Sequence, residues 1–284
     1  YDPSSSSSSV PAGKNYSYTY WTCDPVHPQV NCTIKGSMYW DSVSLAGFGP
    51  APILLGATDF QTANFYQFQD VDGALGFCKG PSNQSVFETL CADGQFCEPV
   101  YGICLHEGTH SNGTLTVGGV DETLADGPIE YVPAPWVDTH VAEVPGTAWQ
   151  EIDFFNITFG LGSSNAITIE NPNATRRAIL DTGTNDLVLP TKMFQQTEEG
   201  LCSASLNLSH CRSLFSGSCF ALSDEEVDAY PPLTIQLDLG VQLHMSSRDY
   251  LLKGSPVALP GQYCLGISDG GPWFLIGDST MQNY

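Results

Sequence analysis

Positive charge is scarce in this 284-residue sequence: 9 Lys and Arg stand against 31 Asp and Glu, for a formal net charge of −22. Such an acidic surface repels nucleic acid and anionic membranes, so we expect neither as a partner. No run of about 18 apolar residues occurs, so no membrane-spanning segment is expected. The cysteines lack the paired CxxC spacing of a structural zinc site. These absences direct attention to proteins that act on other proteins or on small molecules.

Apolar residues and cysteines are plentiful. Hydrophobic residues make up 42% of the chain and aromatics 11%, enough for one large or two medium folded domains. The ten cysteines are even in number, as in proteins of oxidising compartments. Seven Asn-x-Ser/Thr sequons agree with passage through the secretory pathway, at Asn15, Asn31, Asn83, Asn112, Asn156, Asn173 and Asn207. We therefore expect a secreted, glycosylated protein, extracellular or in a lysosome or vacuole.

The hydrophobic pattern is that of an all-β chain. Short runs with apolar residues at alternate positions recur in segments 115–117, 152–159, 233–239 and 241–245, with turn residues between them. Helical patterns are brief and fall at residues 86–90, 193–201 and 224–229. The serine run 4–9 is predicted to be a flexible loop. Val132-Pro133-Ala134-Pro135 favours a boundary that divides the chain into residues 1–132 and 133–284.

The segment with the clearest chemistry is Asp181-Thr182-Gly183-Thr184, which follows the apolar residues 178–180. Gly183 allows the backbone to pass close to the carboxylate of Asp181, and the Thr184 hydroxyl can donate a hydrogen bond to it. A strand that runs into this tetrapeptide resembles the active-site loop of the pepsin-like aspartic proteases.

Further segments resemble that family in the same order along nearly the whole chain. These are Tyr1-Asp2-Pro3-Ser4, Thr19-Tyr20, residues 36–43, Asp72-Gly73-Ala74-Leu75-Gly76, residues 115–121, residues 129–133, Trp149-Gln150, residues 232–235 and Trp273-Phe274-Leu275-Ile276-Gly277-Asp278. Asp41 falls at a position that the family uses structurally, so it is not a catalytic candidate.

The resemblance implies a bilobal, all-β acid protease fold with one catalytic aspartate from each lobe. Two such carboxylates share a proton, so that one acts as general base on a water and the other polarises the scissile carbonyl. No cofactor or metal is required. Asp181 would be the catalytic residue in this chain, Thr182, Gly183 and Thr184 would shape its loop, and Tyr20 would be the flap residue over a peptide or protein substrate. The family further implies a monomer.

The sequence departs from the family pattern at several points. It contains no second Asp-Thr-Gly or Asp-Ser-Gly, because it begins after the place where the first would lie, and Asn283-Tyr284 stops short of the family's last segment. Trp21 follows Tyr20 where the family has Gly, and a Cys23–Cys32 bridge would staple an enlarged flap. Asp186 adds a carboxylate close to Asp181, which would affect the titration of Asp181 if it faced inward.

Two readings of function follow. In the first, the protein is an acid endopeptidase whose 284-residue chain is inactive alone, because half of the aspartate pair is missing. In the second, it is an inactive pepsin-fold protein that binds a peptide, inhibitor or glycan. A retained Asp181 loop favours the enzyme.

Other motifs are set aside or left open. His106-Glu107-Gly108-Thr109-His110 matches the zinc-protease pattern, but it contains Gly and precedes a turn signal where a helix would be needed. The family resemblance implies a Cys219–Cys264 bridge, which leaves Cys202–Cys211. The three possible pairings of Cys78, Cys91, Cys97 and Cys104 cannot be separated by sequence.

Overall fold

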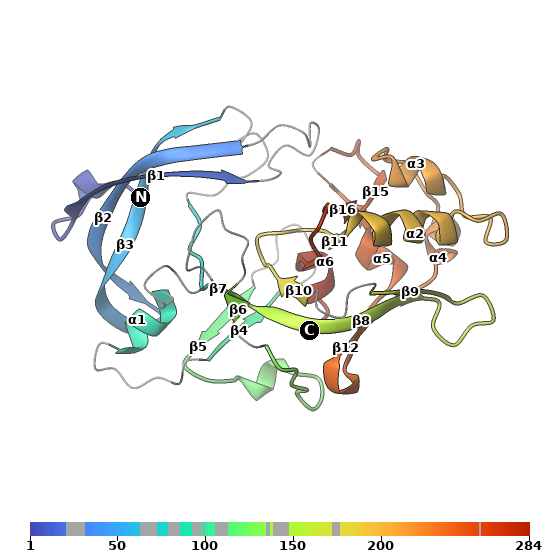
Figure 1. Cartoon of the computed structure of the whole chain (residues 1–284), viewed down its shortest axis with the longest axis horizontal. Coiled ribbons are helices and arrows are strands. Elements are labelled where there is room, and N and C mark those ends of the chain that lie inside the picture. The colour runs from blue at the N-terminus through green and yellow to red at the C-terminus, as the bar shows by residue number, and fades with distance from the viewer. Residues whose placement is uncertain are drawn as a thin grey trace. The chain divides into compact units, whose positions relative to one another are not determined.

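The computed structural model describes residues 1–20, 32–62, 73–78, 86–92, 98, 100–105, 113–134, 137–138, 148–171, 177–255 and 257–284. The chain divides into two compact units. Unit 1 comprises Tyr1–Gly102, Thr116–Val120 and Asp138–Ala148; unit 2 comprises Ile103–Leu115, Asp121–Val137 and Trp149–Tyr284. Strands predominate over helices, which confirms the predicted all-β class (Figure 1). The boundary after residue 132 stays a prediction.

Unit 1 is built on a three-stranded antiparallel sheet in the order β1-β2-β3, with bounds Val10–Tyr20, Cys32–Leu45 and Phe48–Gln61 (Figure 1). Ala46 and Gly47 join β2 to β3 with φ values of 51° and 87°, the left-handed conformation that a tight hairpin requires. Helix α1, Val86–Ala92, packs against β3 and buries Phe87 and Leu90. The segment 36–43 lies in β2 and pairs with β1, as expected for the two arms of one hairpin.

The serine run is not the loose loop that its composition suggests. Pro3–Ser5 form a 3-10 turn, and its N-cap residue Asp2 accepts a hydrogen bond from the Ser4 N–H. The hydroxyls of Ser6 and Ser8 donate to the carboxylate of Asp41, which is 5% exposed in β2. Buried carboxylates attract every donor within reach, so an exposed polar run becomes ordered when it supplies those donors.

Unit 2 contains an eight-stranded sheet in which β13, β12, β8, β10, β17, β11 and β16 follow one another, and β9 pairs with β8 (Figure 1). The long strand β8 lies between β12 and β9 over its second half, and it pairs with β10 over its first. The bounds are Glu151–Phe159 for β8, Ile167–Glu170 for β9, Arg177–Leu180 for β10, Leu187–Leu189 for β11, Leu233–Leu237 for β12, Gln242–Met245 for β13, Ile267–Asp269 for β16 and Leu275–Ile276 for β17.

The described chain also contains three two-stranded sheets. They join β4 (Tyr101–Cys104) to β5 (Thr114–Val117), β6 (Val137–Asp138) to β7 (Ala148–Trp149), and β14 (Leu251–Lys253) to β15 (Tyr263–Leu265). Two further 3-10 turns lie at Glu122–Leu124 and Asp238–Gly240. The second of these ends β12 at Leu237, earlier than the alternation through residue 239 predicts.

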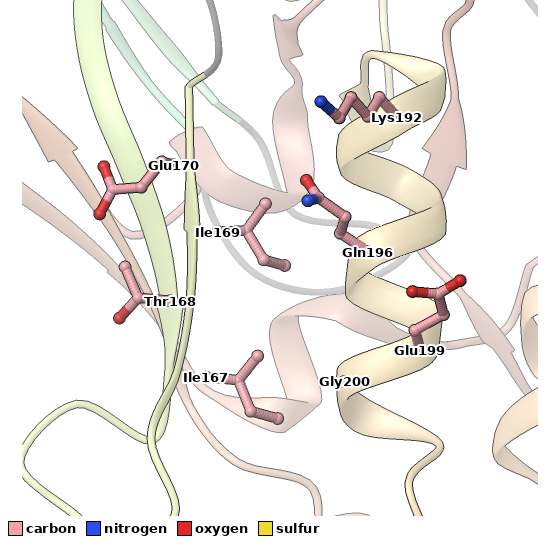
Figure 2. Close-up of a pocket in the computed structure, with 8 residues that line it drawn as sticks. All are labelled: Ile167, Thr168, Ile169, Glu170, Lys192, Gln196, Glu199 and Gly200. Carbon is pink, nitrogen blue, oxygen red and sulfur yellow. The ribbon is translucent and has the colours of Figure 1, made fainter.

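The helices of unit 2 are short except for α2, Thr191–Leu201. Met193, Thr197 and Leu201 are buried at a spacing of four residues, which places one face of α2 on the core. Figure 2 shows α2 running beside β9. Two predicted helices, α2 and α4 (Asp224–Asp228), are confirmed. Three others carry too little periodicity to be foreseen: α3 (Cys211–Phe215), α5 (Ser247–Tyr250) and α6 (Asp278–Met281).

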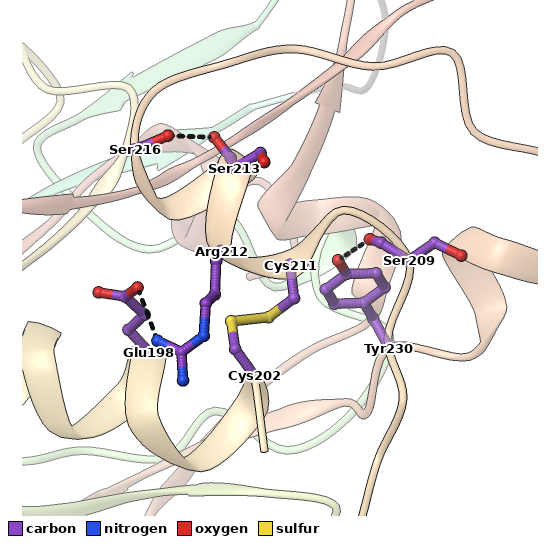
Figure 3. The surroundings of a disulfide bond; sticks show 8 residues. All are labelled: Glu198, Cys202, Ser209, Cys211, Arg212, Ser213, Ser216 and Tyr230. Atoms are coloured by element: carbon purple, nitrogen blue, oxygen red, sulfur yellow. Dashed lines mark hydrogen bonds and ion pairs between the residues drawn. A yellow bond between two sulfur atoms is a disulfide. The ribbon is translucent and has the colours of Figure 1, made fainter. Parts of the chain in front are cut away.

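The main apolar core lies in unit 2. It unites the inward residues of β8, β12 and β11 with helices α2 to α5, and its largest buried side chains include Phe159, Phe274, Tyr230 and Tyr250. Two disulfides border it, Cys202–Cys211 and Cys219–Cys264, and both confirm the predicted pairs. Beside the first, the Tyr230 hydroxyl donates to the Ser209 carbonyl at 2.6 Å (Figure 3).

The remaining cysteines are only partly described. Cys32 and Cys91 are disulfide-bonded, and Cys104 is not. Cys23, needed for the predicted flap bridge, and Cys97 lie outside the described residues. In the part of the chain that the structure describes, no helix has the length and hydropathy to span a membrane.

Candidate active site

The Asp181 loop lies in unit 2 between β10 and β11. The Thr184 hydroxyl donates to Asp181 Oδ2 at 2.7 Å, and the Gly183 N–H donates to Asp181 Oδ1 at 2.9 Å. A Cβ at Gly183 would stand only 3.1 Å from that same Oδ1, so the position favours glycine. Both carboxylate oxygens thus receive a hydrogen bond from the loop itself, and these bonds fix the orientation of the Asp181 side chain.

A second segment of the chain, β17 and the two residues after Gly277, forms backbone hydrogen bonds with this loop. Strand β17 lies between β10 and β11, parallel to the first and antiparallel to the second. The Asp181 N–H donates to the Ile276 carbonyl at 3.1 Å. Beyond β17, the Asp278 N–H donates to the Thr184 carbonyl at 2.8 Å and the Ser279 N–H to the Asn185 carbonyl at 3.0 Å. The backbone of the Asp181 loop is therefore held from both sides by residues almost 100 positions later in the chain.

Gly277 allows the two backbone segments to approach this closely. A Cβ there would lie 2.3 Å from the Thr184 carbonyl oxygen and 2.5 Å from that of Asp186. Both contacts are far inside van der Waals distance and involve backbone atoms, so the chain must move to admit any side chain. Gly277, in the last predicted motif, is thus required for packing.

Asp278 is a second acidic group beside Asp181, and sequence reasoning did not identify it. It opens helix α6, and its Oδ1 atom is buried without a hydrogen-bond partner. Burial, followed by the negative charge of Asp181, raises the pKa of Asp278 to about 6. Asp278 is therefore protonated in acid, where its charge no longer opposes that of Asp181.

Asp186, the extra carboxylate of the sequence, is directed elsewhere. Burial raises the pKa of Asp186, and Ser268 of β16 opposes that shift. The charge of Asp181 is not among the causes of the pKa shift at Asp186, whereas it is one of the two causes at Asp278. The carboxyl that faces the charge of Asp181 is Asp278 rather than Asp186.

The other predicted site residues are placed as follows. Thr182 is exposed at the tip of the loop. Tyr20 ends β1 in unit 1, opposite Cys32, and its ring meets that of Tyr18 edge to face at 4.7 Å. Its role as a flap residue stays a prediction. Trp21, Asp72 and the His106–His110 motif lie outside the described residues. Among those described, no cluster of three His, Cys, Asp or Glu side chains could hold a metal.

Comparison with known proteins connects this geometry to a family. The sequence profile of the eukaryotic aspartyl proteases matches residues 1–284. The chain is 23% identical over 295 residues to gastricsin of Mus musculus and 22% identical, also over 295 residues, to napsin-A of Homo sapiens, with all of this chain aligned in both. It is 20% identical over 257 residues to pepsin A of Canis lupus familiaris, with 89% of this chain aligned.

These alignments cover 66% of mouse gastricsin, 62% of human napsin-A and 60% of dog pepsin A. The chain thus spans less than two thirds of each relative. Within that span, the family profile extends from the first to the last residue, and the sequence carries the Asp-Thr-Gly-Thr loop at Asp181. The chain belongs to the eukaryotic aspartyl protease family, with its pepsin-like, largely β fold.

Proposed function

We propose that this chain is part of an aspartic endopeptidase in which Asp181 is one of two catalytic carboxylates. The observation that carries the proposal is the set of donors on Asp181. Thr184 Oγ1 and the Gly183 N–H hold both carboxylate oxygens in place, and β17 fixes the loop beneath them. An inactive binding protein has no chemical need for an aspartate held in this way.

In the proposed reaction, ionised Asp181 accepts a proton from a water molecule while that water attacks the peptide carbonyl. A second, protonated aspartate donates a hydrogen bond to the carbonyl oxygen and stabilises the charge that develops there. The substrate is a peptide or protein, cleaved between apolar residues in acid. The 284 residues hold one Asp-Thr-Gly, so we propose that the second aspartate comes from sequence beyond them.

The expected setting is secretory: outside the cell, or in a lysosome or vacuole. Two observations support it. The disulfides Cys202–Cys211 and Cys219–Cys264 are of a kind that persists in oxidising compartments. The formal charge of −22 also becomes smaller in acid as carboxylates are protonated, which reduces repulsion within the folded chain. We further propose that the protein acts as a glycosylated monomer.

The decisive experiment begins with the full-length transcript, read upstream of Tyr1. An Asp-Thr-Gly or Asp-Ser-Gly codon run there predicts that the full-length protein cleaves an internally quenched apolar peptide at acid pH. In that protein, Asp181→Asn should lower kcat by about 10²- to 10⁴-fold with little change in KM. Glu225→Gln, on the exposed surface of α4, is the matched control and should leave kcat unchanged.

A complete transcript without the second aspartate would refute the protease and leave the alternative, a binding protein on a protease fold. Full activity of Asp181→Asn would equally refute the assignment of Asp181.

A further inference from the structure

Strand β9 presents an unpaired edge on the surface of unit 2. It pairs antiparallel with β8, so that Ile169 faces Ile157 and Glu170 faces Asn156. The Asn171 N–H donates to the Phe155 carbonyl at 2.7 Å, which fixes the alternation of the ladder. Ile167 and Ile169 must therefore exchange hydrogen bonds with β8, while Thr168 and Glu170 direct their N–H and C=O groups away from it.

The outer edge of β9 has no strand on it within the described part of the chain. The short distance between the hydroxyls of Thr158 and Thr168, 3.0 Å, agrees with a pair that is not hydrogen-bonded through the backbone. The backbone N–H and C=O groups of Thr168 and Glu170 are thus positioned to pair with one more strand. Edges of this kind are templates for extended peptides.

A groove of about 560 Å³ accompanies this edge, between β9 and α2 (Figure 2). Ile167 and Ile169 line its apolar part, and Gln196 extends into it from the helix. Gly200 brings the two elements close at one end, since a Cβ there would lie 2.7 Å from Ile167 Cγ2. The groove is therefore narrow at Gly200 and follows the strand toward Glu170, as an extended segment would.

The charge of the groove favours a basic occupant. Glu170 is exposed on the face of β9 that points away from α2, Glu199 is exposed on α2, and Lys192 is the one cation among the described residues that line the groove (Figure 2). The chain as a whole has a formal charge of −22. A second copy of this chain is disfavoured as occupant, because pairing of two β9 edges would bring two strongly acidic surfaces together.

We propose that the groove between β9 and α2 is a docking site for an extended peptide segment that carries Lys or Arg, which joins the sheet as a strand beside β9. The peptide backbone pairs with the N–H and C=O groups of Thr168 and Glu170. Its basic side chains lie on the Glu170 face of the sheet, and its apolar side chains lie on the opposite face and contact Ile167. None of these residues belongs to the Asp181 loop, so the proposal stands whether or not the protein is a protease.

The probe is a fluorescein-labelled hexapeptide of alternating Val and Lys, titrated with the protein at pH 7 and followed by fluorescence anisotropy. Mass spectrometry before and after the titration confirms that the peptide is intact. We expect saturable binding that weakens as salt rises. A second peptide is N-methylated at the alternate residues that would face β9. Because N-methylation removes the backbone donors and keeps the charge, it should abolish binding; equal affinity of the two peptides would overturn strand addition.

Charge variants test the position of the site. Glu170→Lys should weaken binding about tenfold, since it removes an attraction and adds a repulsion, and Glu199→Lys, on the side of α2, should weaken binding less. Glu225→Lys makes the same change of net charge on α4, outside the groove, and should have a much smaller effect. Thermal melts establish that each variant is folded. If all three weaken binding equally, the attraction is to the whole acidic surface and the groove proposal is wrong.

Sedimentation of the protein without peptide tests the competing occupant. A concentration-dependent dimer that Glu170→Lys changes would assign the edge to a second copy of the chain and overturn the peptide proposal. A monomer at all concentrations supports it.

Discussion

The two units of this protein bury their interiors with different chemistry. Unit 2 packs a continuous apolar core in which Ile157, Phe159, Leu233 and Ile235 are fully buried. In the described part of unit 1, the buried hydrophobic residues are few, chiefly Ala51, Ile53, Phe87, Leu90 and Cys32, and the buried carboxylate of Asp41 lies in the middle of its sheet. Among the described residues, apolar burial thus dominates in unit 2, while the described part of unit 1 combines a few buried apolar residues with hydrogen bonds to one ion.

Two carboxyl groups, Asp41 in unit 1 and Asp278 in unit 2, respond to acid in opposite ways. The hydroxyls of Ser8, Tyr1 and Ser6 hold the pKa of Asp41 well below its usual range, so this contact weakens when acid protonates the carboxylate. In unit 2, burial and the charge of Asp181 raise the pKa of Asp278, so acid relieves an unfavourable charge there. In acid, the protein therefore loses stabilising hydrogen bonds at Asp41 and also loses the repulsion between Asp278 and Asp181.

The largest effect is expected from the core of unit 2. Phe159→Ala removes a fully buried ring that meets Tyr250 edge to face, and should lower the free energy of unfolding by about 3–5 kcal/mol. Urea denaturation measures it, and hydrogen exchange by mass spectrometry assigns it to unit 2. Leu239→Ala, at a side chain that is 73% exposed, is the control. A loss of protection in unit 1 as large as in unit 2 would contradict separate cores.

The next largest effect is expected from the disulfide that borders the same core. Cys202 and Cys211 are nine residues apart. In the chain-entropy model, removal of a disulfide that closes a loop of this length lowers the free energy of unfolding by about 2–3 kcal/mol. The double variant Cys202→Ser with Cys211→Ser should therefore lower the midpoint of urea unfolding by less than Phe159→Ala does. An unchanged midpoint would show that the neighbouring contacts, such as Tyr230 to Ser209, hold this corner without the bridge.

In unit 1, Asp41→Asn should destabilise the sheet at pH 7, because an amide accepts fewer and weaker hydrogen bonds from Tyr1, Ser6 and Ser8. The stability that Asp41 contributes is present above its unfolded pKa of about 3.9 and is lost as pH falls through the lower folded value. The difference in melting temperature between wild type and variant should therefore shrink steadily below about pH 4. A difference that grows in acid would reverse the assigned sign.

The smallest effect concerns Asp278 and has the opposite pH dependence. A folded pKa of about 6 lies above the unfolded value, so the contribution of Asp278 to stability is full in acid and declines as pH rises through 6. Asp278→Asn should stabilise the protein by about 1–2 kcal/mol at pH 7, after allowance for partial solvent exposure, and by almost nothing at pH 3.

Nuclear magnetic resonance gives a direct check of the same pair. Asp181→Asn removes the neighbouring charge and should lower the pKa of Asp278, which burial still keeps above its ordinary value. An unchanged pKa would mean that burial alone accounts for the shift.

Much of the fold was accessible from local pattern. Alternation predicted β8, β12 and β13, and helical patterns predicted α1, α2 and α4, because each of these patterns lies within a few neighbouring residues. Helices α5 and α6 have four residues each, about one turn, so their sequences carry no period at all. The serine run was mistaken for a loose loop, because the donors it supplies matter only when Asp41 is beside them.

The candidate site divides in the same way. Asp181, Gly183 and Thr184 are neighbours in sequence, so a short motif predicts both the loop and its hydrogen bonds. Asp278 lies 97 positions after Asp181, and only the pairing of β17 with β10 brings it to the loop. Its signal was present, since Gly277-Asp278 follows an apolar strand, but a single Gly-Asp pair is too common to identify a site alone.

The sequence by itself determined the all-β class, the family, the Asp181 loop and the two disulfides of unit 2, because each depends on residue order, on short-range contacts or on the resemblance that the order carries. Only the tertiary structure decided that Asp278 rather than Asp186 faces the charge of Asp181, and that β8 is the one described strand that pairs with β9 beside α2. Both depend on which strands become neighbours, and strand neighbours are chosen by the burial of the whole sheet, which no single segment encodes.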